Sequence, residues 1–139
     1  MNQKEAIQLL QEQGYKMTKR RADILYFFSQ EDRYHTAKAL YEYMESSYPG
    51  ISYDTVYRNL HLYHDLGILE STNLHAEKHF RMNCGDHHHH HFICNRCGRT
   101  KKLPICPMNQ VQKMLESYQI NDHKFEVYGL CPGCQLAAS

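Results

Sequence analysis

Two pairs of closely spaced cysteines are the residues with the clearest chemistry in this sequence. They lie in the segments Cys94–Cys97 and Cys131–Cys134, each with two residues between its cysteines. A tight turn of this length directs two sulfur atoms at one cation, and two such turns complete a tetrahedral set of thiolate ligands. Disulfides and a thioredoxin-like redox site are alternatives, but a redox motif needs a single pair at a helix start. The spacing predicts a closed structural zinc site formed by Cys94, Cys97, Cys131 and Cys134.

An internal run of histidines, His87–His91, ends three residues before the first of these cysteines. An expression tag or a solvated polar loop would be the simpler interpretation, although a tag normally lies at a terminus. If the run is a strand, His89 and His91 point to one face while His88 and His90 point to the other. One run could therefore supply ligands to two different metal sites.

Further candidate ligands lie outside the histidine run. Glu70 is at the base of a predicted hairpin, Cys84 lies just upstream of the run, and His123 lies near the far end of the chain. Sulfur and imidazole ligands favour zinc over iron or manganese, so zinc is the expected metal. Cys106 stands between apolar neighbours and is expected to be a buried apolar thiol instead of a ligand.

A second set of candidate functional residues belongs to the predicted helix 53–66. With Val56 and Leu60 facing inward, its opposite face is expected to expose Asp54, Tyr57, Arg58 and His61. A tyrosine and an arginine on this face could contact thymine methyl groups, guanine edges or phosphates. The alternative is a merely solvated helix face.

A basic cluster earlier in the chain favours DNA contact over that alternative. It comprises Lys16, Lys19, Arg20 and Arg21. Residues 1–80 nevertheless carry 9 basic and 11 acidic side chains. Non-specific attraction to DNA is therefore expected to be modest, and tight binding would need dimerisation or a geometry fixed by metal.

The elements that must position these residues can be predicted from apolar spacing and capping residues. Four helices are expected in the N-terminal part, with N-caps at Asn2, Thr18, Thr36 and Ser52. A short Pro-Gly turn joins the third and fourth helices, which gives a helix-turn-helix. Strands at 68–72 and 78–82 then form a hairpin or wing. Further on, strands are expected near 88–93, 99–103 and 124–128, with a helix over about 108–118.

These elements predict an α+β protein with two domains. The first is a winged helix-turn-helix DNA-binding domain over 1–83, followed by a hinge at about 84–87. The second, over 88–139, is an α/β domain that carries the four-cysteine zinc site.

Composition limits the function classes. The 139 residues include 16 Lys and Arg and 15 Asp and Glu, which excludes a basic histone-like tail and an acidic disordered chain. No apolar run approaches the roughly 18 residues of a membrane span, and the polar N-terminus is unlike a signal peptide. A cytoplasmic protein is expected, and in a reducing compartment its 6 cysteines favour metal over disulfides.

The order of these motifs resembles the ferric uptake regulator (Fur) family. The matching segments are Asp54–Leu60 in the helix-turn-helix, the histidine-rich stretch Cys84–Gly98, and His123–Cys134, so the resemblance covers nearly the whole chain. It implies a homodimeric winged-helix repressor with a C-terminal dimerisation domain. Such a repressor binds palindromic operators in double-stranded DNA when it carries metal, and it needs neither a membrane nor a small-molecule substrate.

The resemblance also assigns residues to sites. It implies that structural zinc is bound by Cys94, Cys97, Cys131 and Cys134. It implies a regulatory site between the domains that is formed by Glu70, Cys84, His89 and His91. A third site in the dimerisation domain would be formed by His88, His90 and His123, and the carboxylate that usually belongs to this site corresponds to about Asn109 here. The DNA-contacting residues are Lys16, Tyr57 and Arg58, to which we add Arg21 from the basic cluster.

The metal that is sensed is predicted from Cys84. A thiolate in the regulatory site suits zinc, so we expect a zinc-responsive repressor of zinc-uptake genes. In iron- and peroxide-sensing relatives a histidine that matches His35 joins this site, and an iron or manganese sensor is therefore the alternative. A small zinc hydrolase would need a general base beside an open zinc, and Glu70 is the sole candidate. No enzyme activity is expected.

Overall fold

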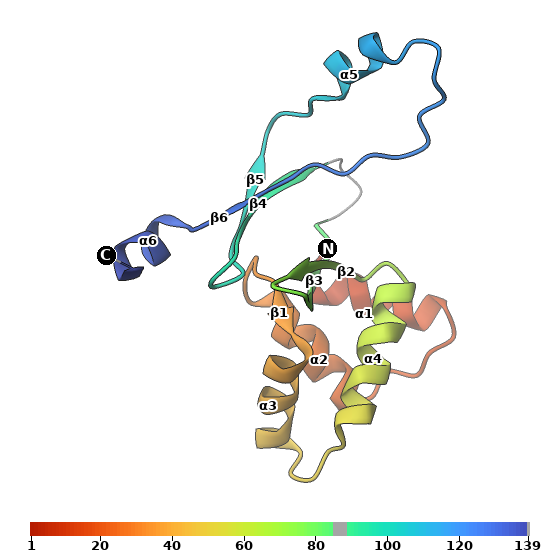
Figure 1. Cartoon of the computed structure of the whole chain (residues 1–139). Coiled ribbons are helices and arrows are strands. Elements are labelled where there is room, and N and C mark those ends of the chain that lie inside the picture. The colour runs from red at the N-terminus through yellow and green to blue at the C-terminus, as the bar shows by residue number, and fades with distance from the viewer. Residues whose placement is uncertain (85–88, 139) are drawn as a thin grey trace. The chain divides into compact units, whose positions relative to one another are not determined.

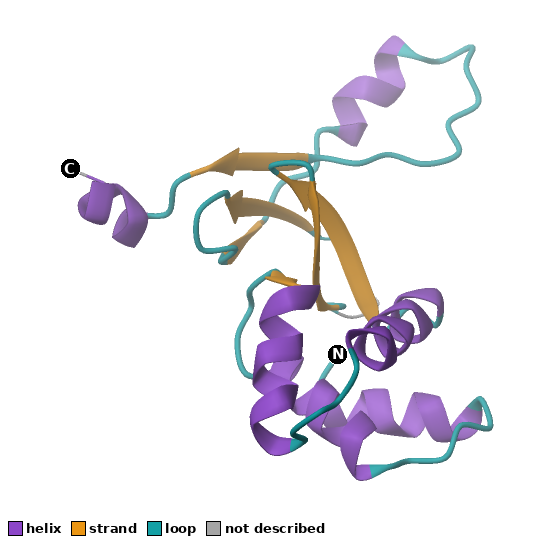
Figure 2. Ribbon diagram, turned by 60° about the horizontal axis from the view of Figure 1, so that its bottom comes forward, coloured by secondary structure: helices purple, strands orange, loops and turns teal. Residues whose placement is uncertain are grey.

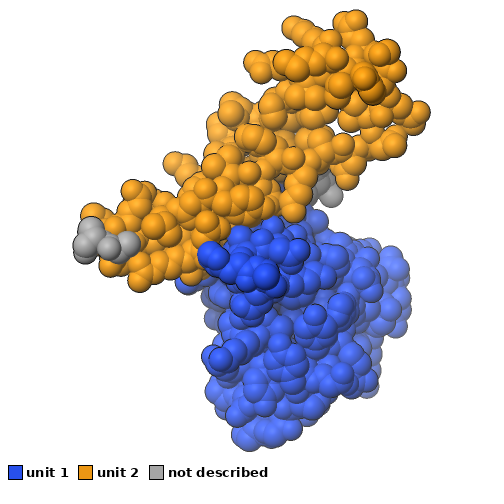
Figure 3. Space-filling view, viewed as in Figure 1, with its two compact units in different colours: residues 1–85 blue, residues 86–139 orange. Residues whose placement is uncertain are grey.

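The computed structural model describes residues 1–84 and 89–138 of the chain (Figure 1). The chain divides into two compact units, Met1–Gly85 and Asp86–Ser139 (Figure 3). The predicted ligand His88 and residues 85–87 of the predicted hinge lie outside the described residues. Within the described part of the chain, no helix has the length and apolar character needed to cross a membrane.

The first unit contains four helices: α1 (Gln3–Glu12), α2 (Lys19–Ser29), α3 (Ala37–Ser47) and α4 (Tyr53–Asp65). Each begins at its predicted cap, where a side-chain oxygen accepts a hydrogen bond from the backbone N–H three residues later; the caps are Asn2, Thr18, Thr36 and Ser52. Such a cap typically contributes about 1 kcal/mol to helix stability. The start of every helix in this unit is therefore encoded locally.

A small antiparallel sheet completes the first unit. It contains β1 (His35–Thr36), β2 (Leu69–Leu74) and β3 (Glu77–Met82), in the order β1-β3-β2. The hairpin β2–β3 follows α4 directly and is the predicted wing. His75 and Ala76 form its turn with positive φ angles of 52° and 63°, the left-handed conformations that tight hairpin turns use.

The core of the first unit joins all four helices to this sheet. Residues spaced by three or four along α4, namely Val56, Leu60 and Tyr63, are fully buried. They pack in one cluster with apolar residues of the other helices and with Phe80 of β3. Burial of this stripe leaves the opposite face of α4 at the surface, as a helix-turn-helix requires.

The second unit is built on another three-stranded sheet. Its strands are β4 (His90–Cys94), β5 (Thr100–Leu103) and β6 (Glu126–Gly129). The central strand β4 pairs with β5 in antiparallel fashion and with β6 in parallel. A short helix α6 (Pro132–Ala138) ends the described chain.

Between β5 and β6 the chain makes a long excursion that carries α5 (Met108–Met114). Figures 1 and 2 show α5 away from the sheet of its own unit. The predicted helix over 108–118 is too long, because the chain leaves helical geometry at Leu115 and turns. No side chain of α5 is buried, so little apolar burial is available to stabilise a longer helix.

Candidate metal centres and DNA-contact surface

The parallel pairing of β4 with β6 positions the four paired cysteines. Cys94 lies opposite Gly129, so both strands end at one edge of the sheet and each runs into its Cys-x-x-Cys turn. All four sulfur atoms lie within 4.8 Å of one another, and those of Cys97 and Cys131 are 3.7 Å apart. Tetrahedral zinc with Zn–S bonds of about 2.3 Å separates its sulfur ligands by about 3.8 Å. The four thiols therefore fit a structural zinc ion.

Backbone N–H groups prepare two of these sulfurs to bind a cation. Burial raises the pKa of Cys94, but hydrogen bonds from the backbone of Cys97, Cys131 and Arg96 outweigh it and lower the pKa to about 6. The backbone N–H of Cys134 likewise lowers the pKa of Cys131. Because a metal ligand must be a thiolate, these donors favour metal binding. All six cysteines are free of disulfides.

A second cluster of metal-type ligands lies on β4 and the excursion that carries α5. Nε2 of His90 is 3.3 Å from Sγ of Cys106, and that sulfur is 3.8 Å from Nε2 of His123. The structure thus brings together His90 and His123, which the sequence assigned to a third site. Asn109, near which the usual carboxylate was expected, is exposed on α5.

Cys106 belongs to this cluster, and the prediction of a buried apolar thiol was wrong. Its side chain is half-buried and lies close to two imidazoles. Strand register explains the placement, because Leu103 pairs with His90 and the chain needs only a short turn to bring Cys106 to that histidine. The relevant signal was the pairing of β4 with β5, which the flanking apolar residues do not reveal.

The predicted regulatory ligands are divided between the two units. Glu70 lies on β2 and Cys84 follows β3 in the first unit, whereas His89 and His91 lie at the start of β4 in the second. The rings of His89 and His91 are 6.4 Å apart. Their assembly into one site remains a prediction.

Glu70 has a basic partner inside the first unit. Its carboxylate lies 3.3 Å from Nε of Arg81, which faces it across the β2–β3 pair. The Arg81 side chain is 3% exposed and also lies 4.0 Å from Asp32. Removal of the Glu70 charge would therefore leave a buried guanidinium with a weaker set of partners.

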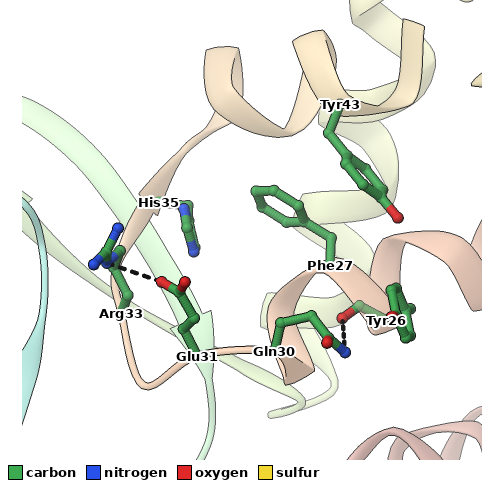
Figure 4. Close-up of a pocket in the computed structure, with 7 residues that line it drawn as sticks. All are labelled: Tyr26, Phe27, Gln30, Glu31, Arg33, His35 and Tyr43. Carbon is green, nitrogen blue, oxygen red and sulfur yellow. Dashed lines mark hydrogen bonds and ion pairs between the residues drawn. The ribbon is translucent and has the colours of Figure 1, made fainter. Parts of the chain in front are cut away.

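His35, the residue of the iron-sensing alternative, is packed among aromatic rings in the first unit. Its ring centroid is 4.6 Å from that of Phe27 and 6.0 Å from that of Phe28. Burial and the nearby charge of Arg33 lower its pKa. Figure 4 shows His35 beside Phe27 in a pocket whose other residues are Tyr26, Gln30, Glu31, Arg33 and Tyr43. The imidazole serves as a packing group here.

The outward face of α4 carries the predicted DNA-contacting residues. Asp54, Arg58 and His61 are exposed, and Arg58 pairs with Asp54 across 3.2 Å. Tyr57 is half-buried instead of exposed, because its ring packs on the core and lies 4.6 Å from the ring of His61. Its hydroxyl end, not its whole ring, is the part suited to contact a partner.

The basic cluster lies beside this helix. Nη1 of Arg21 donates to the backbone oxygen of Lys16 at 2.6 Å, and the guanidinium lies over the ring of Tyr15. Arg21 thus fixes the segment that presents Lys16. A hollow joins the first turn of α2 to α4 and is lined by Thr18, Lys19, Arg20, Arg21, Tyr48, Thr55 and Asn59. Such a basic, hydroxyl-lined surface is suited to a phosphate backbone.

The ferric uptake regulator family matches residues 12–128. The chain belongs to this family. Members of the Fur family are transcription regulators and not enzymes, so the hydrolase alternative is wrong.

Relatives match the whole chain. The ferric uptake regulation protein of Staphylococcus epidermidis (strain ATCC 12228 / FDA PCI 1200) is 51% identical over 139 residues, which is 100% of both chains. That of Staphylococcus aureus (strain Mu50 / ATCC 700699) is 51% identical over 135 residues, 97% of this chain and 99% of the relative. These names refer to iron, so the predicted response to zinc rests on the ligand chemistry of this chain.

Solved Fur-family structures share the fold. The Helicobacter pylori ferric uptake regulator aligns with a TM-score of 0.73 at 15% identity, over 97% of this chain and 95% of that one. A zinc uptake regulator complexed with zinc and DNA aligns with a TM-score of 0.71 at 21% identity, over 99% and 95%. The Vibrio cholerae ferric uptake regulator aligns with a TM-score of 0.67 at 29% identity, over 89% of this chain and 98% of that one. The predicted α+β Fur-type fold is thereby confirmed.

Proposed function

We propose that this Fur-family protein is a zinc uptake regulator, a cytoplasmic repressor of zinc-uptake genes that binds palindromic operators as a metallated homodimer. The observation that carries the choice of metal is the thiol of Cys84 in the predicted regulatory set, whose other members are Glu70, His89 and His91. A thiolate adds softness and negative charge to imidazole and carboxylate ligands, and this combination favours zinc over iron(II) or manganese(II).

The surroundings of His35 support the same choice. An iron or manganese site prefers nitrogen and oxygen donors and would recruit this imidazole. The ring instead packs against Phe27 and Phe28. Four other ligands already complete a tetrahedral shell for zinc, so His35 is not needed.

Exposed apolar side chains support a dimer formed through the second unit. Several large apolar residues of this unit are exposed by about half or more of their surface: Ile105, Met114, Tyr118 and Leu136. Three of them lie on the excursion between β5 and β6 and Leu136 lies on α6, and large exposed apolar side chains of this kind favour contact with a protein surface. A second copy of the chain is the partner that also supplies the second recognition helix that a palindromic operator needs.

The proposed mechanism is linkage between zinc and DNA. Zinc bound by ligands from both units favours the one arrangement in which the two α4 helices of a dimer meet successive major-groove half-sites. Those half-sites lie about 34 Å apart. When zinc is scarce this arrangement is no longer favoured, and the operator is released.

Selection of DNA in the presence of defined metals tests the proposal. The full-length protein is exposed to a random duplex library in parallel with zinc, iron(II) or manganese(II), and the affinity of any enriched duplex is then measured against free metal concentration. We expect zinc to enrich a palindromic sequence and to tighten its binding. Enrichment with iron(II) or manganese(II) but not with zinc would contradict the proposal and favour the iron or peroxide sensor.

Arg58→Ala should weaken operator binding without affecting the fold. The side chain is 73% exposed and its pair with Asp54 is equally solvated, so its loss costs little stability. If Arg58 contacts a base edge, we expect a loss of about 1–3 kcal/mol in binding and relaxed preference at one operator position. Lys113→Ala, which removes an exposed charge from α5, is the matched control. Unchanged affinity of the Arg58 variant at every salt concentration would reject α4 as the reading helix.

A further inference from the structure

We propose that the thiolate of Cys106 completes a zinc-type site with His90 and His123 in the second unit. The family resemblance placed a carboxylate near Asn109 in such a site, and this chain has a neutral amide there. The thiolate replaces that carboxylate and changes which metals the site accepts. The inference concerns the second unit alone and does not depend on the metal that the regulatory site senses.

The ligand atoms have the separations that a zinc ion needs. With Zn–S bonds of about 2.3 Å and Zn–N bonds of about 2.05 Å, tetrahedral geometry separates sulfur from nitrogen by about 3.6 Å. The two observed distances from Sγ of Cys106, 3.3 Å to His90 and 3.8 Å to His123, lie on either side of this value. All three ligand atoms lie within 4.8 Å of one another. Small side-chain movements would therefore suffice to bind the ion.

Burial and charge also favour a ligand role for these residues. His90 is 6% exposed and its ring lies edge-on to that of Phe125, which fixes the orientation of the imidazole. Two neutral imidazoles provide no negative charge, so Cys106 supplies the anionic ligand. These three residues leave one coordination position of tetrahedral zinc for a water molecule or a further residue.

The thiolate makes the site selective. Thiolate and imidazole ligands suit zinc and cobalt(II), whereas carboxylate and water ligands suit magnesium and manganese. A site with a carboxylate in this place would accept oxygen-preferring metals more readily. Cys106 should therefore bias the site against manganese(II).

Metal in this site would fasten the α5 excursion to the sheet. Cys106 precedes α5 and His123 follows it, while His90 belongs to the central strand β4. Since no side chain of α5 is buried, the helix has little apolar packing of its own. A metal ion that binds both ends of the excursion would restrict it, because binding energy at such a site becomes local folding energy.

Cobalt(II) spectroscopy tests the site directly. The experiment uses the full-length Cys84→Ser variant with its structural zinc in place. This substitution removes the other predicted thiolate ligand outside the four-cysteine site, so that a thiolate band can come from Cys106. We expect added cobalt(II) to give a thiolate-to-cobalt charge-transfer band of one equivalent per chain. Cys106→Ser in this background should abolish the band, Cys106→Asp should bind cobalt(II) without it, and Asn109→Ala should leave it unchanged. Zinc analysis of each sample checks that the four-cysteine site has not exchanged its metal.

The same samples give a second measurement. Zinc should slow hydrogen exchange across residues 108–125 when Cys106 is present, and Cys106→Ser should lose this protection. Loss of an outer-shell partner typically lowers metal affinity by about 10–100-fold. Because Cys106 is proposed as a direct ligand, Cys106→Ser should lower zinc affinity at the site by more than this. A band that is absent in the background variant, or that survives Cys106→Ser, would overturn the proposal. Because neither measurement involves DNA, failure here is distinguishable from failure of the proposed repressor function.

Discussion

Cys97→Ser should remove one zinc ion per chain and unfold the second unit. The four thiols hold together the ends of β4 and β6, and apparent binding energies of structural zinc sites are about 10–16 kcal/mol at neutral pH. The second unit is small and leaves much apolar surface exposed, so it buries little apolar area that could stabilise its fold without zinc. Metal analysis by mass spectrometry, circular dichroism during heating and size-exclusion chromatography would show the loss of metal, of structure and of the dimer.

A different cysteine of the same unit provides the matched control. Cys106 is also half-buried, but it lies outside the four-cysteine cluster, so Cys106→Ser should keep the structural zinc and the sheet even if metal is lost from the cluster with His90 and His123. Retention of the fold during heating therefore distinguishes the two variants. If Cys97→Ser instead stays folded, dimeric and fully metallated, the assignment of the structural site is wrong.

The second large effect separates zinc sensing from iron sensing through two single changes. If zinc is the signal, Cys84→Ser should abolish zinc-dependent operator binding while the structural zinc remains. His35→Ala should then lower the stability of the first unit, because the ring packs against Phe27 and Phe28, but should leave zinc-dependent operator binding in place, since the ligand shell is complete without it. If iron or manganese is the signal, His35→Ala should be the damaging change. Operator affinity against free zinc, iron(II) and manganese(II) for the wild type and both variants provides the measurement.

Glu70 would be a poorer test residue, although it belongs to the same predicted ligand set. Its carboxylate also balances the buried guanidinium of Arg81, so its loss disturbs the first unit whether or not zinc binds there. Cys84 belongs to no ion pair among the described residues of the unit, and serine keeps its approximate size. Normal zinc-dependent repression by Cys84→Ser would exclude the zinc uptake regulator assignment.

Local signals predicted much of this molecule. Helix starts depend on a capping side chain and the next three residues, and Asn2, Thr18, Thr36 and Ser52 all cap as expected. The four-cysteine site could be predicted equally well, because the two cysteines of each pair are separated by only two residues. Features determined within a few residues of sequence can be predicted from that sequence.

Features that depend on pairing between distant segments could not be predicted in this way. Cys106 reaches His90 only because β4 and β5 pair in one particular register, which brings Leu103 opposite that histidine. Tyr57 is half-buried because the core extends beyond the stripe of Val56 and Leu60. Helix α5 is shorter than predicted because no side chain of it is buried, and helical periodicity in the sequence does not indicate whether a helix will be buried.

The parallel pairing of β4 with β6 also has a consequence for how the protein is made. Cys94 lies opposite Gly129, so during synthesis one edge of β4 has no partner until 35 further residues have emerged. Unpaired edges of strands invite pairing with other chains, and closure between distant segments is slow. Zinc bound to the first Cys-x-x-Cys turn can capture the second as it emerges and shorten the exposure of that edge. A shortage of zinc would therefore reduce the yield of folded regulator as well as its occupancy by metal.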